Sequence, residues 1–486
     1  PFPEEQGGAP GDGPEVLARD IASGGYGLSD PAALHIFVSE GLRVLTEHAA
    51  CGVPYLRDAA GGYRTYATLG MSYPRVGEVK HDGAGLTLSL RKELLHRGAL
   101  LVEDVAITGL VLNRDGVQGA WGTSNGGDTG YVFIAPVVIL ACGAATELYP
   151  LRSASFPTTG DGYRLALEAG ARLRNMEFVE FTVIPCVRGV PLASGGIKPT
   201  LAAGATLLNG KGERFLSRHD PALPENTTRS VLVKAVVGEM RQGRGPCAVD
   251  ASAVERPTSL LKCLAEGQGL DYRRERIPLS PGVHAFLGGV WTDPYGRTGV
   301  PGLFASGETA GLNGVFGADR VGGALAVCQV LGAVCGREAA AETRLRHRAE
   351  AKEVRRNARC AKAGFPHGNA AGPLDGSEVL RKVHQLAETV GVARTGMEIE
   401  QGAAGFNGLY REIAGVISAA SDADPKWGLK FFELQNLALT GAAVALSALA
   451  RCESRGQHWR LDCPQSDPAY TGWVVVEQEG GLKSKL

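Results

Sequence analysis

Two segments of the chain place a glycine directly after a short apolar run. Residues 135–142 (APVVILAC) lead into Gly143, and residues 300–306 (VPGLFAS) lead into Gly307 and Glu308. In open α/β sheets, ligands bind at the carboxyl ends of the strands. A glycine there admits the ligand close to the backbone, and an acid can accept a hydrogen bond from a sugar hydroxyl. Either segment alone is weak support for a nucleotide site.

Three basic residues could bind or protonate an acidic substrate. Arg229 ends the stretch TTR, His284 comes shortly before a double glycine, and Arg320 lies in GADRVGG. Arginine presents a planar pair of donors that fits a carboxylate. Each residue also has a structural interpretation. Arg229 could cap a helix or pair locally, and His284 could be a satisfied histidine at a strand end. Arg320 could form an ion pair with its neighbour Asp319.

These segments belong to a longer series of motifs. In chain order the series is Cys142-Gly143, TGDG (159–162), Met176-Glu177-Phe178, GKGERF (210–215), TTR (227–229), His284 with Gly288-Gly289, VPGLFASGE (300–308), GADRVGG (317–323) and RCESRGQHWRLDCP (451–464). The series resembles the flavoprotein subunits of the fumarate reductase and succinate dehydrogenase family. L-aspartate oxidase and the adenylylsulfate reductase flavoprotein are relatives. The resemblance runs from about residue 12 to the tail.

The resemblance implies an α/β fold and FAD as the cofactor. Three parts are expected: an FAD-binding Rossmann-like domain with an incomplete N-terminal part, an inserted α+β capping domain, and a C-terminal helical domain. We place the FAD-binding domain at 1–178 and 283–343, the capping domain at 179–282, the helical domain at 344–450 and a tail at 451–486. More prolines and weaker periodicity in the middle of the chain fit an inserted domain.

The resemblance also implies roles for single residues. His284 and Arg320 match residues that bind the substrate and its carboxylate. Arg229 matches the proton donor to the carbon beside the one that receives hydride. Hydride transfer to an activated alkene leaves a carbanion-like carbon that must be protonated. The positions expected at FAD are Val105, Ala141, Gly143, Thr159, Asp161, Gly288, Gly289, Gly307, Glu308, Gly323, Ala324 and Leu325.

The chain departs from the family pattern near its start. The family begins with a G-x-G-x-x-G turn that binds the ADP half of FAD at a helix N-terminus. The nearest stretch here, GAGLTL (83–88), has leucine in place of the third glycine. We therefore expect that the dinucleotide-binding segment is truncated or is supplied by another chain. The 486 residues alone are then expected to bind FAD poorly or not at all.

The capping region departs as well. Residues 181–184 (FTVI) stand where family members that act on fumarate carry a His-Pro-Thr stretch. Residues 201–205 (LAAGA) stand at the R-G-E-G-G stretch of the proton relay, and Lys198 falls where the relay glutamate would be. Ala324 also replaces an asparagine that many relatives carry after the double glycine. These changes argue against fumarate or succinate as the substrate, while redox chemistry at a flavin is still expected.

Two functions remain open at this point. The first is an FAD-dependent oxidoreductase that transfers hydride between the flavin and a carboxylate-bearing substrate. The alternative is an incomplete or non-catalytic flavoprotein-like subunit that serves in complex assembly. Ten cysteines are scattered without a C-x-x-C pair, so we expect no metal or iron–sulfur cluster in the chain. Electrons would then come from a separate partner, such as an iron–sulfur subunit, or leave to oxygen.

The hydrophobic pattern predicts the elements that must position these residues. Helices are expected within 14–48, in 83–104 ahead of a buried strand, and at 159–173, 380–390 and 434–449. Strands are expected at 107–112 and 118–121 around a turn, at 135–142 in a parallel sheet covered on both faces, and at 283–292 and 300–306. The segment ESRG (453–456) is expected to carry paired charges that seal the helical domain against the cap.

The composition excludes several classes of protein. Fifty Lys and Arg against 51 Asp and Glu leave no global field to attract nucleic acid or an anionic membrane. The basic stretch 344–362 is interpreted as a solvated helix face or linker. The longest apolar run, residues 131–145, is too short to span a bilayer, and the first residues lack a signal-peptide pattern. We expect a cytoplasmic protein, peripheral to a membrane at most through partner subunits.

Overall fold

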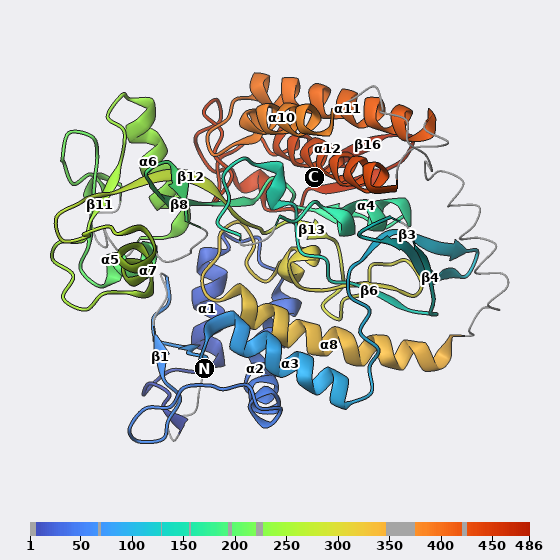
Figure 1. Cartoon of the computed structure of the whole chain (residues 1–486), viewed down its shortest axis with the longest axis horizontal. Helices are drawn as coiled ribbons and strands as arrows, with labels where there is room; N and C mark the ends of the chain where they lie inside the picture. Colours follow the sequence, from blue (N-terminus) through green and yellow to red (C-terminus); the bar gives the residue numbers. More distant parts are fainter. Residues whose placement is uncertain are drawn as a thin grey trace.

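The structure is a computed structural model that describes most of the chain. The described residues are 6–66, 70–127, 129–154, 157–192, 197–219, 227–346, 375–419 and 425–486. They form a central α/β body, a domain to one side of it, and a layer of long helices on top (Figure 1). Most of the basic stretch 344–362 lies outside the described residues.

The helical pattern predicted within 14–48 forms two helices. They are α1 (Pro14–Gly24) and α2 (Pro31–Ala50). Asp30 caps α2, because its carboxylate accepts the backbone N–H groups of Ala32 and Ala33 at 3.0 and 3.2 Å. Their apolar faces share one core with the long helix α8 (Ala324–Leu345), which follows the arginine-bearing loop. This packing holds that loop against the N-terminal helices.

The third helix is followed by no strand of the kind expected. Helix α3 spans Asp82–His96, and the residues from 99 to 103 have no regular structure. The prediction of a buried strand before residue 104 is therefore wrong. Leu100 is 87% exposed, since no described element packs over it, and an apolar run without a covering surface gains nothing from strand geometry.

The strands that follow were placed more accurately. Strands β3 (Val105–Asn113), β4 (Gly116–Ser124) and β5 (Gly130–Ile134) form an antiparallel sheet, which confirms the predicted hairpin. Strand β6 (Val138–Leu140) runs parallel to β14 (Leu303–Ala305), also as predicted. The expectation that this sheet is covered on both faces is wrong for β6, because Ile139 is 42% exposed.

The domain at the left of Figure 1 contains a five-stranded antiparallel sheet in the order β10-β11-β12-β8-β9. Its strands are β8 (Val179–Val187), β9 (Val190–Pro191), β10 (Thr206–Leu208), β11 (Ala248–Asp250) and β12 (Ile277–Phe286). Its helices are α5 (Ile197–Ala202), η3 (Leu216–Arg218), α6 (Arg229–Arg241) and α7 (Ser259–Gln268). We call it the cap. Because β8 and β12 both run back into the central body, they bring cap residues to its edge.

The chain then returns to the body and ends in the helical layer. The remaining elements of the body are β1 (Thr65–Tyr66), β2 (Val76–Gly77), η2 (Thr146–Leu148), α4 (Asp161–Glu168), β7 (Leu173–Arg174), β13 (Gly289–Val290) and η4 (Gly307–Gly314). The helical layer contains α10 (Gly376–Ala387), η5 (Glu388–Val390), α11 (Gly396–Ala419) and α12 (Pro425–Ala450). The predicted helices at 159–173, 380–390 and 434–449 correspond to α4, α10 and α12.

The last residues are more ordered than a polar tail. After the short helix η6 (Pro468–Tyr470), strands β15 (Val475–Gln478) and β16 (Leu482–Lys485) extend a sheet of order β13-β7-β15-β16. The chain end is thereby fixed beside the body. Two helical stretches, Ala324–Leu345 and Gly428–Ala450, are long and apolar enough to cross a membrane by length and composition alone. The second is mostly buried inside the protein, as expected of a core helix.

Candidate active site

Two of the predicted basic residues meet at one buried carboxylate, Glu180. Arg229 begins helix α6 of the cap, and its Nη1 donates to Glu180 Oε1. Arg320 comes from the loop before α8, and its Nε lies 2.9 Å from Oε2 and 3.2 Å from Oε1 of Glu180. Glu180 itself is completely buried at the start of β8. The structure therefore brings Arg229 and Arg320 together at the junction of cap and body.

His284 lies on the neighbouring strand of the same sheet. Strand β12 pairs with β8 so that Ala285 faces Glu180, and the register shifts between Val283 and Ala285. His284 occupies this bulge, a distortion that re-aims a side chain at a sheet edge. Its Nδ1 lies 2.6 Å from Ser153 Oγ, and its charge acts on Glu180. All three predicted catalytic residues thus surround one carboxylate.

The loop that carries Arg320 is held by its neighbour Asp319. The Asp319 carboxylate accepts the Arg320 backbone N–H at 2.8 Å, the Ser230 hydroxyl at 2.5 Å and the Gln457 amide at 2.9 Å. These donors come from the body, the cap and the C-terminal segment. The ion pair between Asp319 and Arg320 that the sequence left open is a backbone contact, and the Arg320 side chain is free to reach Glu180.

The charges in this cluster depend on one another. Burial would raise the pKa of Glu180, but the nearby cations Arg229, Arg320 and His284 reverse this and hold the pKa well below its usual range. Burial lowers the pKa of Arg229, Glu180 opposes that effect, and Arg320 adds to it. Glu180 is therefore an anion throughout the neutral range, and Arg229 is a better acid than an exposed arginine.

Sequence reasoning did not select Glu180, Asp319 or Ser153 as site residues. Glu180 had a detectable signal, because it is a lone acid in the apolar run FVEFTVIP. A carboxylate in such a strand is expensive to bury unless cations neutralise it. Asp319 was noticed only as a partner for Arg320. Ser153 had no signal, since a single serine outside any motif does not indicate its partner.

The arrangement agrees with the relatives of the chain. A family model described as "FAD binding domain" matches residues 2–325, and one described as "Fumarate reductase flavoprotein C-term" matches residues 381–479. The chain is 31% identical to a fumarate reductase (CoM/CoB) subunit from Methanothermobacter marburgensis, over 97% of this chain and 87% of that protein. It is 32% identical to the L-aspartate oxidase of Caulobacter vibrioides, with the same coverage of both proteins.

The chain belongs to the fumarate reductase and succinate dehydrogenase flavoprotein family. The predicted family, fold class and FAD cofactor are confirmed. Among solved structures, the chain resembles FrdA of E. coli quinol fumarate reductase with a TM-score of 0.88 and 22% identity, over 98% of this chain and 87% of that chain. It resembles Mycobacterium smegmatis Sdh1 in complex with UQ1 with a TM-score of 0.82 and 25% identity, over 98% and 84%.

The residues at the carboxyl ends of β6 and β14 fit the FAD of this family. Ala141 is exposed directly after β6, and Gly143 follows in a left-handed conformation with φ of +74°. Glu308 follows β14, and Thr309 links the two strand ends by donating to Gly143 O at 2.9 Å. Burial raises the pKa of Glu308 to about 6, so its carboxyl changes charge near neutrality. A polar acceptor and open glycine backbone thus lie side by side at one sheet edge.

The predicted FAD glycines divide into two groups. A Cβ at Gly288 would lie 2.2 Å from Asn175 O, and one at Gly289 would lie 2.4 Å from Gly311 N, so both are required by packing within the chain. A Cβ at Gly323 would meet nothing within 4 Å, and one at Gly307 would have its closest contact at 3.4 Å. Open space beside Gly323 is what a cofactor that approaches the backbone requires.

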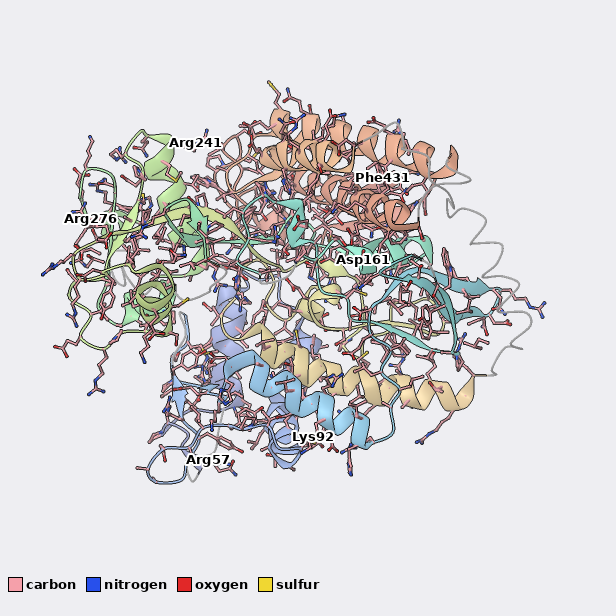
Figure 2. All side chains as sticks on the ribbon, viewed as in Figure 1. Arg57, Lys92, Asp161, Arg241, Arg276 and Phe431 are labelled. Atoms are coloured by element: carbon pink, nitrogen blue, oxygen red, sulfur yellow. The ribbon has the colours of Figure 1, made fainter. Side chains whose placement is uncertain are left out.

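The other expected FAD positions lie at three places. Ala324 and Leu325 begin α8 beside Gly323, and Leu325 is 60% exposed, as a residue on an open cofactor face would be. Val105 begins β3 and is half-buried. Asp161 begins α4 under α12 (Figure 2), where its Oδ1 accepts from Thr159 Oγ1 at 2.9 Å and from Asn436 Nδ2 at 2.5 Å. The role of each in binding FAD remains a prediction.

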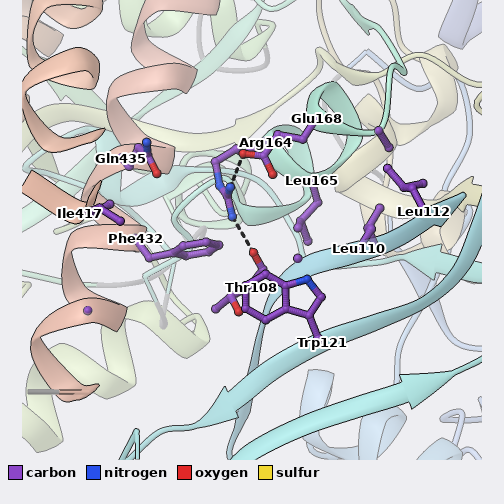
Figure 3. A pocket seen from close by; sticks show the side chains of 13 residues that line it. Thr108, Leu110, Leu112, Trp121, Arg164, Leu165, Glu168, Ile417, Phe432 and Gln435 are labelled. Carbon is purple, nitrogen blue, oxygen red and sulfur yellow. Dashed lines mark hydrogen bonds and ion pairs between the residues drawn. The ribbon is translucent and has the colours of Figure 1, made fainter. Parts of the chain in front are cut away.

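One enclosed cavity lies away from this cluster. It has a volume of about 280 Å³ and lies between the β3–β4 sheet, α4 and the C-terminal helices (Figure 3). Arg164 crosses it, with its guanidinium over the Phe432 ring and hydrogen bonds to Asn436 and to the Thr108 carbonyl. None of the predicted site residues lines this cavity, so it does not mark the active site.

The C-terminal segment 451–464 is structural, as expected for ESRG. Arg451 Nε lies 2.5 Å from Glu177 Oε1, and its Nη1 lies 3.2 Å from Glu453, with all three side chains buried. On the cap side, Lys234 Nζ donates to the Gly456 carbonyl at 2.6 Å. The segment therefore ties the body to the cap, as predicted. Within it the thiols of Cys452 and Cys463 lie 2.7 Å apart, so these two cysteines are not isolated.

No group of three or more His, Cys, Asp or Glu side chains suited to a metal occurs among the described residues. The electron partner of the chain therefore remains a prediction.

Proposed function

We propose that this chain transfers hydride between FAD and a carbon atom of a substrate that carries a carboxylate. Bound FAD supplies the hydride donor or acceptor. The observation that supports the proposal is the convergence of Arg229, Arg320 and His284 at the junction of cap and body. This cluster combines fixed cations with a candidate acid, as reduction of an activated alkene requires.

The residues divide the work between binding and proton transfer. Arg320 is fixed at its backbone by Asp319, and its guanidinium is held by Glu180 and by the Gly322 carbonyl at 3.0 Å. It orients the substrate carboxylate together with His284, whose ring is held by Ser153. Arg229 donates the proton, and the burial that lowers its pKa makes this easier. Closure of the cap over the site excludes water.

Arg229 differs from the other arginines of the cap in this respect. Arg241 and Arg276 project from the outer edge of the cap (Figure 2), whereas Arg229 is only 8% exposed and faces the body. Burial of a cation at a domain junction is costly and indicates a use for it.

The substitution Arg320→Ala tests the proposal. With FAD supplied and a reduced dye as electron donor, we expect the variant to lose turnover of unsaturated carboxylic acids while its thermal midpoint and bound FAD stay unchanged. Arg218→Ala is the matched control, because this cap arginine has a side chain that is 50% exposed. Equal turnover in Arg320→Ala and the wild type would refute the assignment. Absence of turnover in the wild type with every acid would favour the non-catalytic alternative.

We also propose that electrons reach the flavin from a separate iron–sulfur protein. The support is that the nine described cysteines are free and that the described residues hold no metal group. The cytoplasmic location also remains a prediction.

A further inference from the structure

The arginine pair already holds an internal carboxylate. Both oxygens of Glu180 are engaged, Oε1 by Arg229 and Arg320, and Oε2 by Arg320 at 2.9 Å. The side chain is completely buried. A carboxylate between two arginines has the chemistry of a bound anionic substrate, but this one belongs to the chain.

The fixed charges around this carboxylate are balanced. Three cations and three carboxyl groups act on one another in and beside the cluster: Arg229, Arg320 and Lys234, and Glu180, Asp319 and Glu308. Burial lowers the pKa of Lys234 to about 8, and burial raises that of Glu308 to about 6, so both are mainly charged at pH 7. The cluster therefore lacks the excess positive charge that would favour a dianion.

Few donors remain for an incoming carboxylate. Arg320 spends its Nε on Glu180 and its Nη1 on the Gly322 carbonyl. Arg229 Nε is buried and has no hydrogen-bond partner among the described residues. An unsatisfied guanidinium N–H in a buried site is costly unless a ligand accepts it. The remaining capacity suits one carboxylate beside Arg229.

We propose that Glu180 restricts this site to substrates with a single carboxylate. The inference rests on the proposed function, since it assumes that carboxylic acids bind at Arg229 and Arg320. Glu180 repels a second carboxylate and occupies the donors that would hold it. It acts as a specificity-determining residue and takes no proton, because both of its oxygens already accept from arginine.

The test compares two acids of equal chain length, butanoate and succinate. Their binding to the full chain with FAD added is measured by isothermal titration calorimetry, for the wild type and Glu180→Gln. Glu239→Gln is the matched control, since Glu239 is another buried acid, paired with Arg244 at 2.7 Å on the far side of α6. Binding, and not turnover, is the readout.

We expect the wild type to bind succinate no more tightly than butanoate. In Glu180→Gln, succinate should gain about tenfold or more relative to butanoate, a factor worth about 1.4 kcal/mol. Glu239→Gln should behave like the wild type. A wild type that prefers succinate tenfold overturns the inference even if Glu180→Gln fails to fold. Failure of both acids to bind the FAD-loaded wild type overturns the proposed function as well.

Discussion

Glu308 gives the protein a pH dependence that a single substitution should remove. Its pKa is raised from 4.5 to about 6 mainly by burial, against the Phe286 N–H, which it accepts at 3.0 Å, and against Arg320. Because the folded pKa lies above the unfolded one, the carboxyl favours the folded state below about pH 4.5. That contribution is lost as the pH rises through about 6.

The size of the effect follows from the same values. A rise from 4.5 to about 6 corresponds to about 2 kcal/mol, at ~1.4 kcal/mol per pKa unit. In Glu308→Gln, the amide oxygen can still accept the Phe286 N–H, but the group cannot ionise. Relative to the wild type, the variant should therefore be more stable at about pH 8 than at about pH 4.5, by up to about 2 kcal/mol.

The assay is the thermal midpoint of the cofactor-free protein, measured by scanning calorimetry at both pH values and one scan rate. Glu103→Gln serves as the control, because its side chain is 65% exposed and its pairing with Arg91 is a surface contact. It should show no pH-dependent difference from the wild type. The reasoning is refuted if Glu308→Gln differs from the wild type by the same amount at both pH values, or loses stability as the pH rises.

Two further predictions concern the scaffold and the cofactor. Glu177→Gln should destabilise the fold by about 3 kcal/mol, because it leaves the buried Arg451 with one fewer counter-charge, whereas Glu103→Gln should cost less than about 1 kcal/mol; equal thermal midpoints would contradict this. Gly288→Ala should cost about 1–3 kcal/mol through its clash with backbone. Gly323→Ala should leave the cofactor-free midpoint unchanged but weaken FAD binding in a fluorescence titration, and unaltered affinity would remove Gly323 from the cofactor site.

The sequence predicted the parts of the site that depend on local pattern. The strand ends before Gly143 and Gly307 were correct, because an apolar run that stops at a glycine is a local signal. The strand expected before residue 104 was wrong, since burial of Leu100 depends on what covers it and not on its own run. Glu180 was missed for a similar reason. Its partners Arg229 and Arg320 lie 49 and 140 residues away, and only the fold brings them together.

The most direct test of hydride transfer at this site is a single turnover without oxygen. The FAD-loaded protein is reduced by light, mixed with unsaturated monocarboxylic acids, and followed by the visible absorbance of the flavin. We predict that the absorbance returns as one equivalent of the saturated acid forms, and that Arg320→Ala abolishes both. Absorbance that returns only when oxygen is admitted, with no saturated acid formed from any of the acids, would contradict the account.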